Sequence, residues 1–402
     1  MSSHLLQLAS RLDQIAPFHV MELAKMAAEL EQQGRHLIHM GIGEPDFTAP
    51  QPVIDAAARA MADGRMQYTS ALGLPALREA IAAHYRDGYG VDVSPTRIVV
   101  TAGASAALLL ACAALVEKGS EVLMPDPCYP CNRHFVAAFD GLAKLVVSGP
   151  EHRFQLSDAM VRENWGAATR GVLLASPSNP TGTSIDTEEL RSIVETVRGK
   201  GGFTIVDEIY HGLRYDAPPF SALSLGDDLI VINSFSKYFN MTGWRLGWLV
   251  APEALVPAIE KLAQNLFICP SSIAQHAALA CFAPHTRTIY EARKQEFRRR
   301  RDYLVPALRE LGFSVPVMPD GAFYIYADCS ALSGDADQLT RAMLNEAGVV
   351  MVPGLDFGEH AARRYVRISY ATSMENLQEA VTRLTSFLAS RPNISGTQTS
   401  RQ

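Results

Sequence analysis

Short, uninterrupted runs of apolar residues recur through the middle of the chain. Each run is followed by a polar loop and then by a segment with helical periodicity. Continuous apolar runs are typical of strands in a parallel sheet that is buried on both faces. The pattern therefore predicts an α/β fold whose large part is a mainly parallel, seven-stranded sheet covered by helices on both faces. The runs comprise residues 97–100, 121–124, 145–147, 171–175, 203–206, 229–232 and 246–250.

The two ends of the chain have a different pattern. Residues 18–33 carry apolar side chains at helical spacing and stop at Gly34, a residue type that commonly ends helices. Residues 291–310 read as a long, strongly charged helix, and we expect its arginine run, 298–301, to lie on a solvated face. Short apolar strands then alternate with helices, which is typical of a smaller α/β unit.

These changes predict two domains. We expect a large, ligand-binding domain over residues 49–289. A smaller α/β domain is expected to combine residues 290–390 with residues 1–48, which include an N-terminal arm. Residues 391–402 are rich in Ser, Thr, Gln and Asn, and we expect them to form a disordered tail.

Composition and charge exclude several classes of protein. The 402 residues are 48% hydrophobic and 19% charged, which is ordinary for a globular chain. A formal net charge of −6 gives no electrostatic reason to expect a nucleic-acid partner. No apolar run reaches the roughly 18 residues that a membrane helix needs, so no membrane partner is expected. The first residues lack the pattern of a secretory signal, so we expect a cytoplasmic protein.

The six cysteines are scattered, and only Cys128 and Cys131 have CxxC spacing. A structural zinc site would need a second such pair, so we expect no metal site. A thioredoxin-like redox role stays open beside two other interpretations. In one the pair is purely structural, and in the other it flanks a functional Tyr129.

Polar residues follow the predicted strands at their carboxyl ends, where open parallel sheets bind ligands. Gly103-Ala104-Ser105 lies at an expected helix start, whose free N–H groups suit a phosphate. Asn179 lies between prolines, and its bond to Pro180 is a candidate cis peptide. Asp207 directly follows a buried strand. It would be costly to bury there without a partner such as a cationic ring nitrogen.

Lys237 follows the next strand, within Ser234-Phe235-Ser236-Lys237, and Arg245 comes eight positions later. A lysine just past a buried strand is well placed to be a desolvated amine. Schiff-base chemistry with a carbonyl compound requires such an amine.

Together these motifs resemble those of the class I/II aminotransferase family, which are pyridoxal-phosphate (PLP) enzymes of fold type I. The resemblance runs from about residue 15 to residue 388. It implies PLP as cofactor and a ping-pong transfer of an amino group between an L-amino acid and a 2-oxo acid. The motifs that carry it are Gly41–Phe47, Ser176–Gly182, Asp207–Tyr210, Ser234–Lys237, Thr242–Gly247 and Tyr365–Ile368.

The resemblance implies a role for each matching residue. Lys237 would bind the cofactor covalently and act as acid and base. Asp207 would pair with the protonated ring nitrogen, and Tyr129 would stack on the ring. Asn179 and Tyr210 would hydrogen-bond its phenolic oxygen. The phosphate would be held by Gly103, Ala104, Ser105, Ser234, Ser236 and Arg245, and by Tyr68 of the neighbouring subunit in a homodimer.

The resemblance also implies a carboxylate site. Arg367 would grip the substrate α-carboxylate, helped by Asn179 and the backbone of Gly43. A dicarboxylic donor would need a second cation, and no residue stands out for that role. The mostly apolar segment 15–20 lies where relatives close over the substrate side chain, which favours a neutral or apolar donor.

Two alternatives stay open. A PLP-dependent lyase, such as a β C–S lyase, would share nearly every residue named. A PLP-sensing transcription regulator would carry an added N-terminal DNA-binding domain, whereas only about 15 residues precede the aminotransferase pattern here.

Overall fold

The computed structural model describes residues 8–17 and 19–391. The first seven residues of the predicted arm, Phe18 and residues 392–402 of the predicted tail lie outside the described residues. The helices are α1 (His19–Gln32), α2 (Gln51–Ala62), α3 (Pro75–Tyr89), α4 (Gly103–Leu115), α5 (Pro130–Ala137), α6 (Asp158–Asn164), α7 (Thr187–Gly199), α8 (Val256–Leu266), α9 (Ser272–Ala278), α10 (Pro284–Glu310), α11 (Ala336–Ala342) and α12 (Met374–Ala389). The strands are β1 (Ile38–His39), β2 (Ile98–Thr101), β3 (Glu121–Asp126), β4 (Leu142–Val147), β5 (Thr169–Ala175), β6 (Phe203–Asp207), β7 (Ile230–Ser234), β8 (Gly247–Val250), β9 (Tyr324–Asp328), β10 (Val349–Val350), β11 (Val352–Pro353) and β12 (Tyr365–Ser369).

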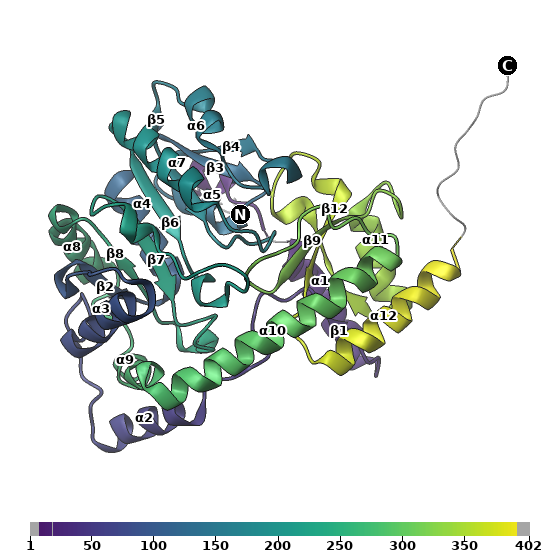
Figure 1. The fold of residues 1–402 in the computed structure, drawn as a ribbon, viewed down its shortest axis with the longest axis horizontal. Helices are drawn as coiled ribbons and strands as arrows, with labels where there is room; N and C mark the ends of the chain where they lie inside the picture. Colours follow the sequence, from purple (N-terminus) through teal and green to yellow (C-terminus); the bar gives the residue numbers. More distant parts are fainter. Residues whose placement is uncertain (1–7, 18, 392–402) are drawn as a thin grey trace, which may run out of the picture.

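A seven-stranded sheet forms the centre of the molecule, in the order β2-β8-β7-β6-β5-β3-β4 (Figure 1). The pairs from β7 through β6, β5 and β3 to β4 are parallel. Strand β8 runs antiparallel to both of its neighbours. The predicted mainly parallel, seven-stranded α/β sheet is therefore confirmed.

Helices cover both faces of this sheet. Successive side chains of a strand point to opposite faces, so each strand packs against both helix layers. In β5, Leu173 packs into the cluster formed with α4 and α8. Its neighbours Val172 and Leu174 pack into the opposite cluster, with α2, α3, α7 and α9. The continuous apolar runs in the sequence are the direct result of this double burial.

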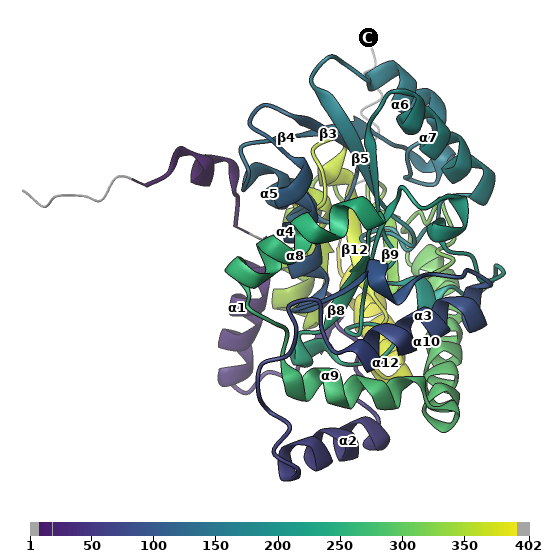
Figure 2. The same cartoon turned by 90° about the vertical axis from the view of Figure 1, so that its left-hand side faces the viewer.

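The C-terminal part contains the antiparallel sheet β11-β12-β9. The parallel pair β1–β10 joins the N-terminal residues to it through Ile38 and Val349. The 27-residue helix α10 runs along both parts (Figure 1). The domain boundaries expected at residues 49 and 290 stay a prediction, since α10 crosses residue 290 without interruption. Residues 8–17 project from the body of the molecule (Figure 2).

The arginine run of α10 differs from the prediction. Arg298 and Arg299 are exposed, but the side chains of Arg300 and Arg301 are only 5% and 4% exposed. Arg300 pairs with Asp46 at 2.8 Å, and Arg301 with Asp216 at 2.6 Å. The prediction of a solvated face is wrong for these two, because four consecutive residues span more than one full helical turn.

Two further properties concern the described part of the chain. No helix in residues 8–17 and 19–391 combines the length and apolar character needed to cross a membrane. Within the same residues, no group of three or more His, Cys, Asp or Glu side chains is placed to hold a metal ion.

Candidate active site

The carboxyl ends of β5, β6 and β7 face a cavity of about 480 Å³. Other walls come from α1, α4, β9 and β12, so the site lies between the central sheet and the C-terminal part. The cavity brings together most of the residues proposed from the sequence. Those that line it are Gly43, Ala104, Ser105, Tyr129, Asn179, Asp207, Tyr210, Ser236, Lys237, Arg245 and Arg367.

Lys237 is a buried amine at the centre of this cavity. Its Nζ donates a hydrogen bond of 2.5 Å to the carbonyl oxygen of Gly43. Burial lowers the pKa of Lys237 to about 8, with Arg367 and Arg245 acting in the same direction and Glu44 opposing them. A lowered pKa increases the neutral fraction near pH 7, and the neutral amine is the nucleophilic form.

Asp207 is a buried carboxylate with few partners. Its Oδ1 accepts a 3.0 Å hydrogen bond from the backbone N–H of Ile209. It forms no ion pair with any described residue, and burial raises its pKa to about 7 although Lys237 and the Ile209 bond oppose this. A carboxylate in this setting is suited to a cationic group from a ligand, such as a protonated ring nitrogen.

Arg367 is the matching buried cation. Its Nη1 donates to Asn179 Oδ1 at 3.0 Å, and its Nη2 donates to the carbonyl oxygen of Gly41 at 2.6 Å. The Nε atom is buried without a partner, and the residue is 4% exposed. No carboxylate of the described chain pairs with it, so the guanidinium is available for a carboxylate from a ligand. The Asn179–Pro180 bond is cis, as expected.

An anion cradle forms at the start of α4. Gly103 has φ +81°, a conformation that favours glycine, and its missing side chain leaves room for the guanidinium of Arg245, whose Nη2 would lie 2.6 Å from a Cβ there. Ala104 and Ser105 follow in the first turn of α4, where backbone N–H groups are free. Ser236 lines the same part of the cavity. Free N–H groups, a hydroxyl and a guanidinium form a donor set that fits a phosphate.

Ser234 lies behind this cradle. It is 1% exposed, its Oγ donates to Leu246 O at 3.0 Å, lies 2.9 Å from Ser236 Oγ and accepts from the N–H of Ser236 at 3.0 Å. These contacts indicate that Ser234 orients Ser236, because its own hydroxyl is fully used inside the protein. A direct contact of Ser234 with a phosphate stays a prediction.

Tyr129 lines the cavity just before α5, between the two cysteines of the CxxC pair. Burial raises the pKa of Cys128 to about 12 and also raises that of Cys131. Reactive thiols need the opposite shift, so both thiols stay protonated and a thioredoxin-like role is disfavoured. All six cysteines are free.

Tyr68 is the one predicted site residue that lies far from this cavity. It sits in the loop between α2 and α3 and is 81% exposed. Tyr68 therefore takes no part in the cavity of its own chain, and its role stays a prediction.

Sequence reasoning missed Tyr324. Its hydroxyl forms a 2.8 Å hydrogen bond with that of Tyr210, and its ring lies 4.7 Å from the guanidinium carbon of Arg367. A Cβ on Gly43 would approach the Tyr324 hydroxyl to 2.8 Å. Nothing in the sequence separates Tyr324 from the other aromatic residues of its strand.

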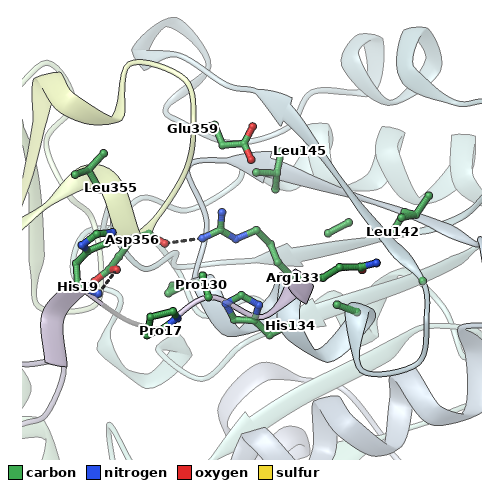
Figure 3. A pocket seen from close by; sticks show the side chains of 15 residues that line it. Pro17, His19, Pro130, Arg133, His134, Leu142, Leu145, Leu355, Asp356 and Glu359 are labelled. Carbon is green, nitrogen blue, oxygen red and sulfur yellow. Dashed lines mark hydrogen bonds between the residues drawn. The ribbon is translucent and has the colours of Figure 1, made fainter. Parts of the chain in front are cut away.

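Asp356 was also missed, and it fixes one wall of the cavity. Its carboxylate oxygens accept hydrogen bonds from the backbone N–H groups of His19 at 2.7 Å and Val20 at 2.8 Å. Arg133 Nη2 donates to the carbonyl oxygen of Asp356 at 2.7 Å (Figure 3). Free N–H groups at a helix start need such partners. Asp356 thus holds the first turn of α1, from which Val20 and Met21 line the cavity.

Comparisons with known proteins agree with this geometry. Residues 35–384 match the family model for class I and II aminotransferases. The chain is 38% identical over 379 residues to the valine–pyruvate aminotransferase of Mycobacterium tuberculosis, covering 94% of this chain and 97% of that one. A crystal structure of an aminotransferase from Mycobacterium tuberculosis has a TM-score of 0.92 at 37% identity, with 96% and 100% of the chains covered. The Thermus thermophilus aspartate aminotransferase with maleate has a TM-score of 0.90 at 33% identity, with 95% and 100% covered.

Proposed function

The chain belongs to the class I and II aminotransferases, and from that membership we propose that it moves an amino group from a neutral, apolar L-amino acid to a 2-oxo acid. It is a PLP-dependent transaminase of fold type I. PLP supplies the electron sink that stabilises negative charge on the substrate Cα. The choice of donor is the part that rests on this chain's own residues.

The observation that carries the proposed donor class is the makeup of the cavity wall. The cavity has an apolar wall, and its residues include Val20, Met21, Ala24, Ile42, Leu108 and Phe357. Two arginines line the cavity, Arg367 and Arg245, and Arg245 belongs to the phosphate cradle. Among the described residues of this chain, no further arginine or lysine is left for a second carboxylate on the donor, and burying an unpaired carboxylate is costly.

The name of one relative agrees with this donor class. The Mycobacterium tuberculosis protein, 38% identical over 379 residues, is named for valine and pyruvate. Other relatives at similar identity are named for aspartate, so the names alone do not decide. We give the apolar wall more weight, because it is made by this chain.

We propose these roles for the site residues. Lys237 Nζ would attach the cofactor and carry the proton from the substrate Cα to the cofactor carbon that receives the amino group. Asp207 holds the ring nitrogen protonated, and Tyr129 packs on the ring. Asn179 and Tyr210 bind the phenolic oxygen. Gly103, Ala104, Ser105, Ser236 and Arg245 hold the phosphate, while Arg367, Asn179 and the Gly43 backbone hold the substrate carboxylate.

A donor panel tests the proposed substrate class. The donors are valine, leucine, phenylalanine, aspartate and glutamate, with pyruvate or 2-oxoglutarate as acceptor. We expect kcat/KM for the first three to exceed that for aspartate and glutamate by about tenfold or more. A cost of about 1.4 kcal/mol for burying an unpaired carboxylate is enough for a tenfold difference. The 2-oxo acid product and free ammonia are both measured. Aspartate or glutamate as the best donor would contradict the apolar class. Release of free ammonia without a new amino acid would contradict transamination.

Replacing Asp356 with alanine should weaken binding of apolar donors. Losing the cap on α1 is expected to cost about 1 kcal/mol and to loosen the wall formed by Val20 and Met21, raising KM about fivefold with a smaller change in kcat. Steady-state kinetics with the best donor measure this. Asp186→Ala is the matched control, because Asp186 caps α7 in the same way away from the cavity. Equal KM changes in both variants would remove Asp356 from the substrate wall.

We propose that the enzyme is a homodimer in which Tyr68 reaches the phosphate of the neighbouring site. Two apolar residues close to Tyr68 in the sequence, Met61 and Met66, are also exposed, at 48% and 53%. Exposed apolar side chains of this size would gain from burial against a protein partner. The cytoplasmic location and the expected absence of nucleic-acid and membrane partners stay predictions.

Mixing two defective variants tests this arrangement. Tyr68→Ala should weaken PLP binding by about tenfold or more, as expected for the loss of a hydrogen bond to a charged group. In a mixed dimer, the Tyr68→Ala chain keeps Lys237, and the Lys237→Ala chain supplies Tyr68 to that site. One of the two sites should therefore bind PLP with parental affinity. Light scattering reports the mass. A monomer at micromolar concentration, or no recovery of affinity on mixing, would contradict the shared site.

A further inference from the structure

A second cavity, of about 200 Å³, lies directly behind the active site. Tyr210 and Lys237 line the active cavity, while their chain neighbours His211 and Tyr238 line this one. The same two segments thus form the partition between the cavities. Its other walls come from the end of α3 and the first half of α10. None of the transamination roles above uses it.

The cavity carries an excess of positive charge. Arg214, Arg287 and Lys294 line it, against one carboxylate, Glu291. Glu291 already accepts a 2.6 Å hydrogen bond from the Tyr238 hydroxyl, and it lies 3.9 Å from Lys294.

The two arginines have no such partner. Within the described residues neither Arg214 nor Arg287 forms an ion pair or donates a side-chain hydrogen bond, and Nε of Arg214 is buried without a partner. This differs from the buried arginines of α10, Arg300 and Arg301, which are paired with carboxylates. Two unpaired guanidinium groups at one cavity form a site for an anion, most favourably a carboxylate or phosphate that matches their planar fork.

The remaining wall is aromatic and uncharged. The ring of Tyr89 stacks on that of His211 at 4.5 Å between centroids, with 11° between planes. His84, Tyr238 and Phe239 also line the cavity. Burial lowers the pKa of His84 to about 4 and that of His211 to about 3, so both rings are neutral near pH 7. A flat apolar body would pack against such faces.

We propose that this cavity binds a small aromatic carboxylate, with its acid group on Arg214 and Arg287 and its ring against the aromatic wall. The volume matches about seven waters of liquid, which suits one six-membered ring with a short acid group. The ligand could be a metabolite from outside the reaction or an aromatic 2-oxo acid made by the enzyme. Both present the same ring and carboxylate. The site does not depend on which donor the active site prefers.

Calorimetric titration of the holoenzyme with benzoate tests the site. The active site also binds carboxylates, so the titration uses the Arg367→Ala holoenzyme, in which that anchor is absent. One benzoate per chain should still bind, with a Kd of about 1 mM, as a nine-atom ligand of ordinary efficiency would. Adding Arg214→Gln and Arg287→Gln should weaken it at least tenfold. Adding Arg298→Gln and Arg299→Gln, on the exposed part of the same helix, should leave it unchanged.

A second variant avoids removing charge. Gly88 lines the cavity, and a Cβ there would meet only the His84 ring, at 3.9 Å or more, so Gly88→Leu should fold and fill the space. It should abolish benzoate binding while the parental Tm is kept. Phenylpyruvate in place of benzoate tests the product as a source, and inorganic phosphate tests a site for anions in general. Benzoate binding that survives Gly88→Leu or the two glutamines, or phosphate binding without benzoate binding, would overturn the proposal.

Discussion

Lys237→Ala is expected to abolish amino-group exchange and leave the fold intact. The lost amine is both the covalent attachment point and the proton carrier, so kcat should fall by about 10⁴-fold or more. Among the described residues of the cavity, Tyr210 is a poor replacement, since burial raises its pKa well above its usual range. Exchange of amine between an amino acid and a 2-oxo acid, followed as new 2-oxo acid, measures the effect.

The fold should tolerate this change, because the Nζ of Lys237 makes one hydrogen bond, to Gly43, and burying an amine is itself unfavourable. Thermal unfolding should therefore show a Tm at or above that of the parent. Lys261→Ala, on the exposed side of α8, is the matched control and should retain full activity. Exchange at near the parental rate by the Lys237 variant would disprove the assignment of this residue.

Arg367→Ala is expected to raise KM for every amino donor. The α-carboxylate would lose its buried, charge-assisted partner, a loss of about 2–5 kcal/mol, equivalent to about 30-fold or more. The sharpest measurement compares valine with isobutylamine, which lacks the carboxylate. The parent enzyme should prefer valine strongly, and the variant should lose most of that preference.

A neighbouring arginine provides the control. Arg363 lies four residues earlier, its side chain is 62% exposed, and it pairs with Asp335 at 2.6 Å. Arg363→Ala should therefore leave both KM and the preference for valine unchanged. If Arg367→Ala kept the parental KM for valine, Arg367 would not belong to the carboxylate site.

The central sheet could be predicted from the sequence because strands buried on both faces have uninterrupted apolar runs, such as 203–206. The antiparallel direction of β8 could not be predicted, because an apolar run does not indicate which way its strand lies in the sheet. The local motifs around Gly103, Asp207 and Lys237 were equally accessible, since each places its chemistry within a few residues of a strand end.

Contacts between distant parts of the chain were not accessible. Tyr324 meets Tyr210 across 114 positions, and Asp356 caps a helix 337 positions away. In the sequence the first resembles any buried aromatic residue, and the second any loop aspartate. The inward turn of Arg300 and Arg301 depends likewise on carboxylates supplied by remote loops, which helical periodicity alone does not reveal.

The loop at Gly41 and Gly43 forms hydrogen bonds with groups that would otherwise be free for ligands. Its carbonyl oxygens occupy Nη2 of Arg367 and Nζ of Lys237, the two groups that the reaction needs. Once Lys237 holds the cofactor, an incoming substrate still has to displace the Gly41 carbonyl from Arg367. A carboxylate can do so, because it adds a full negative charge and a two-oxygen fork that match the guanidinium. An amide, ester or alcohol offers a neutral oxygen, as the loop already does. The Gly41 contact therefore favours amines that carry a free carboxylate.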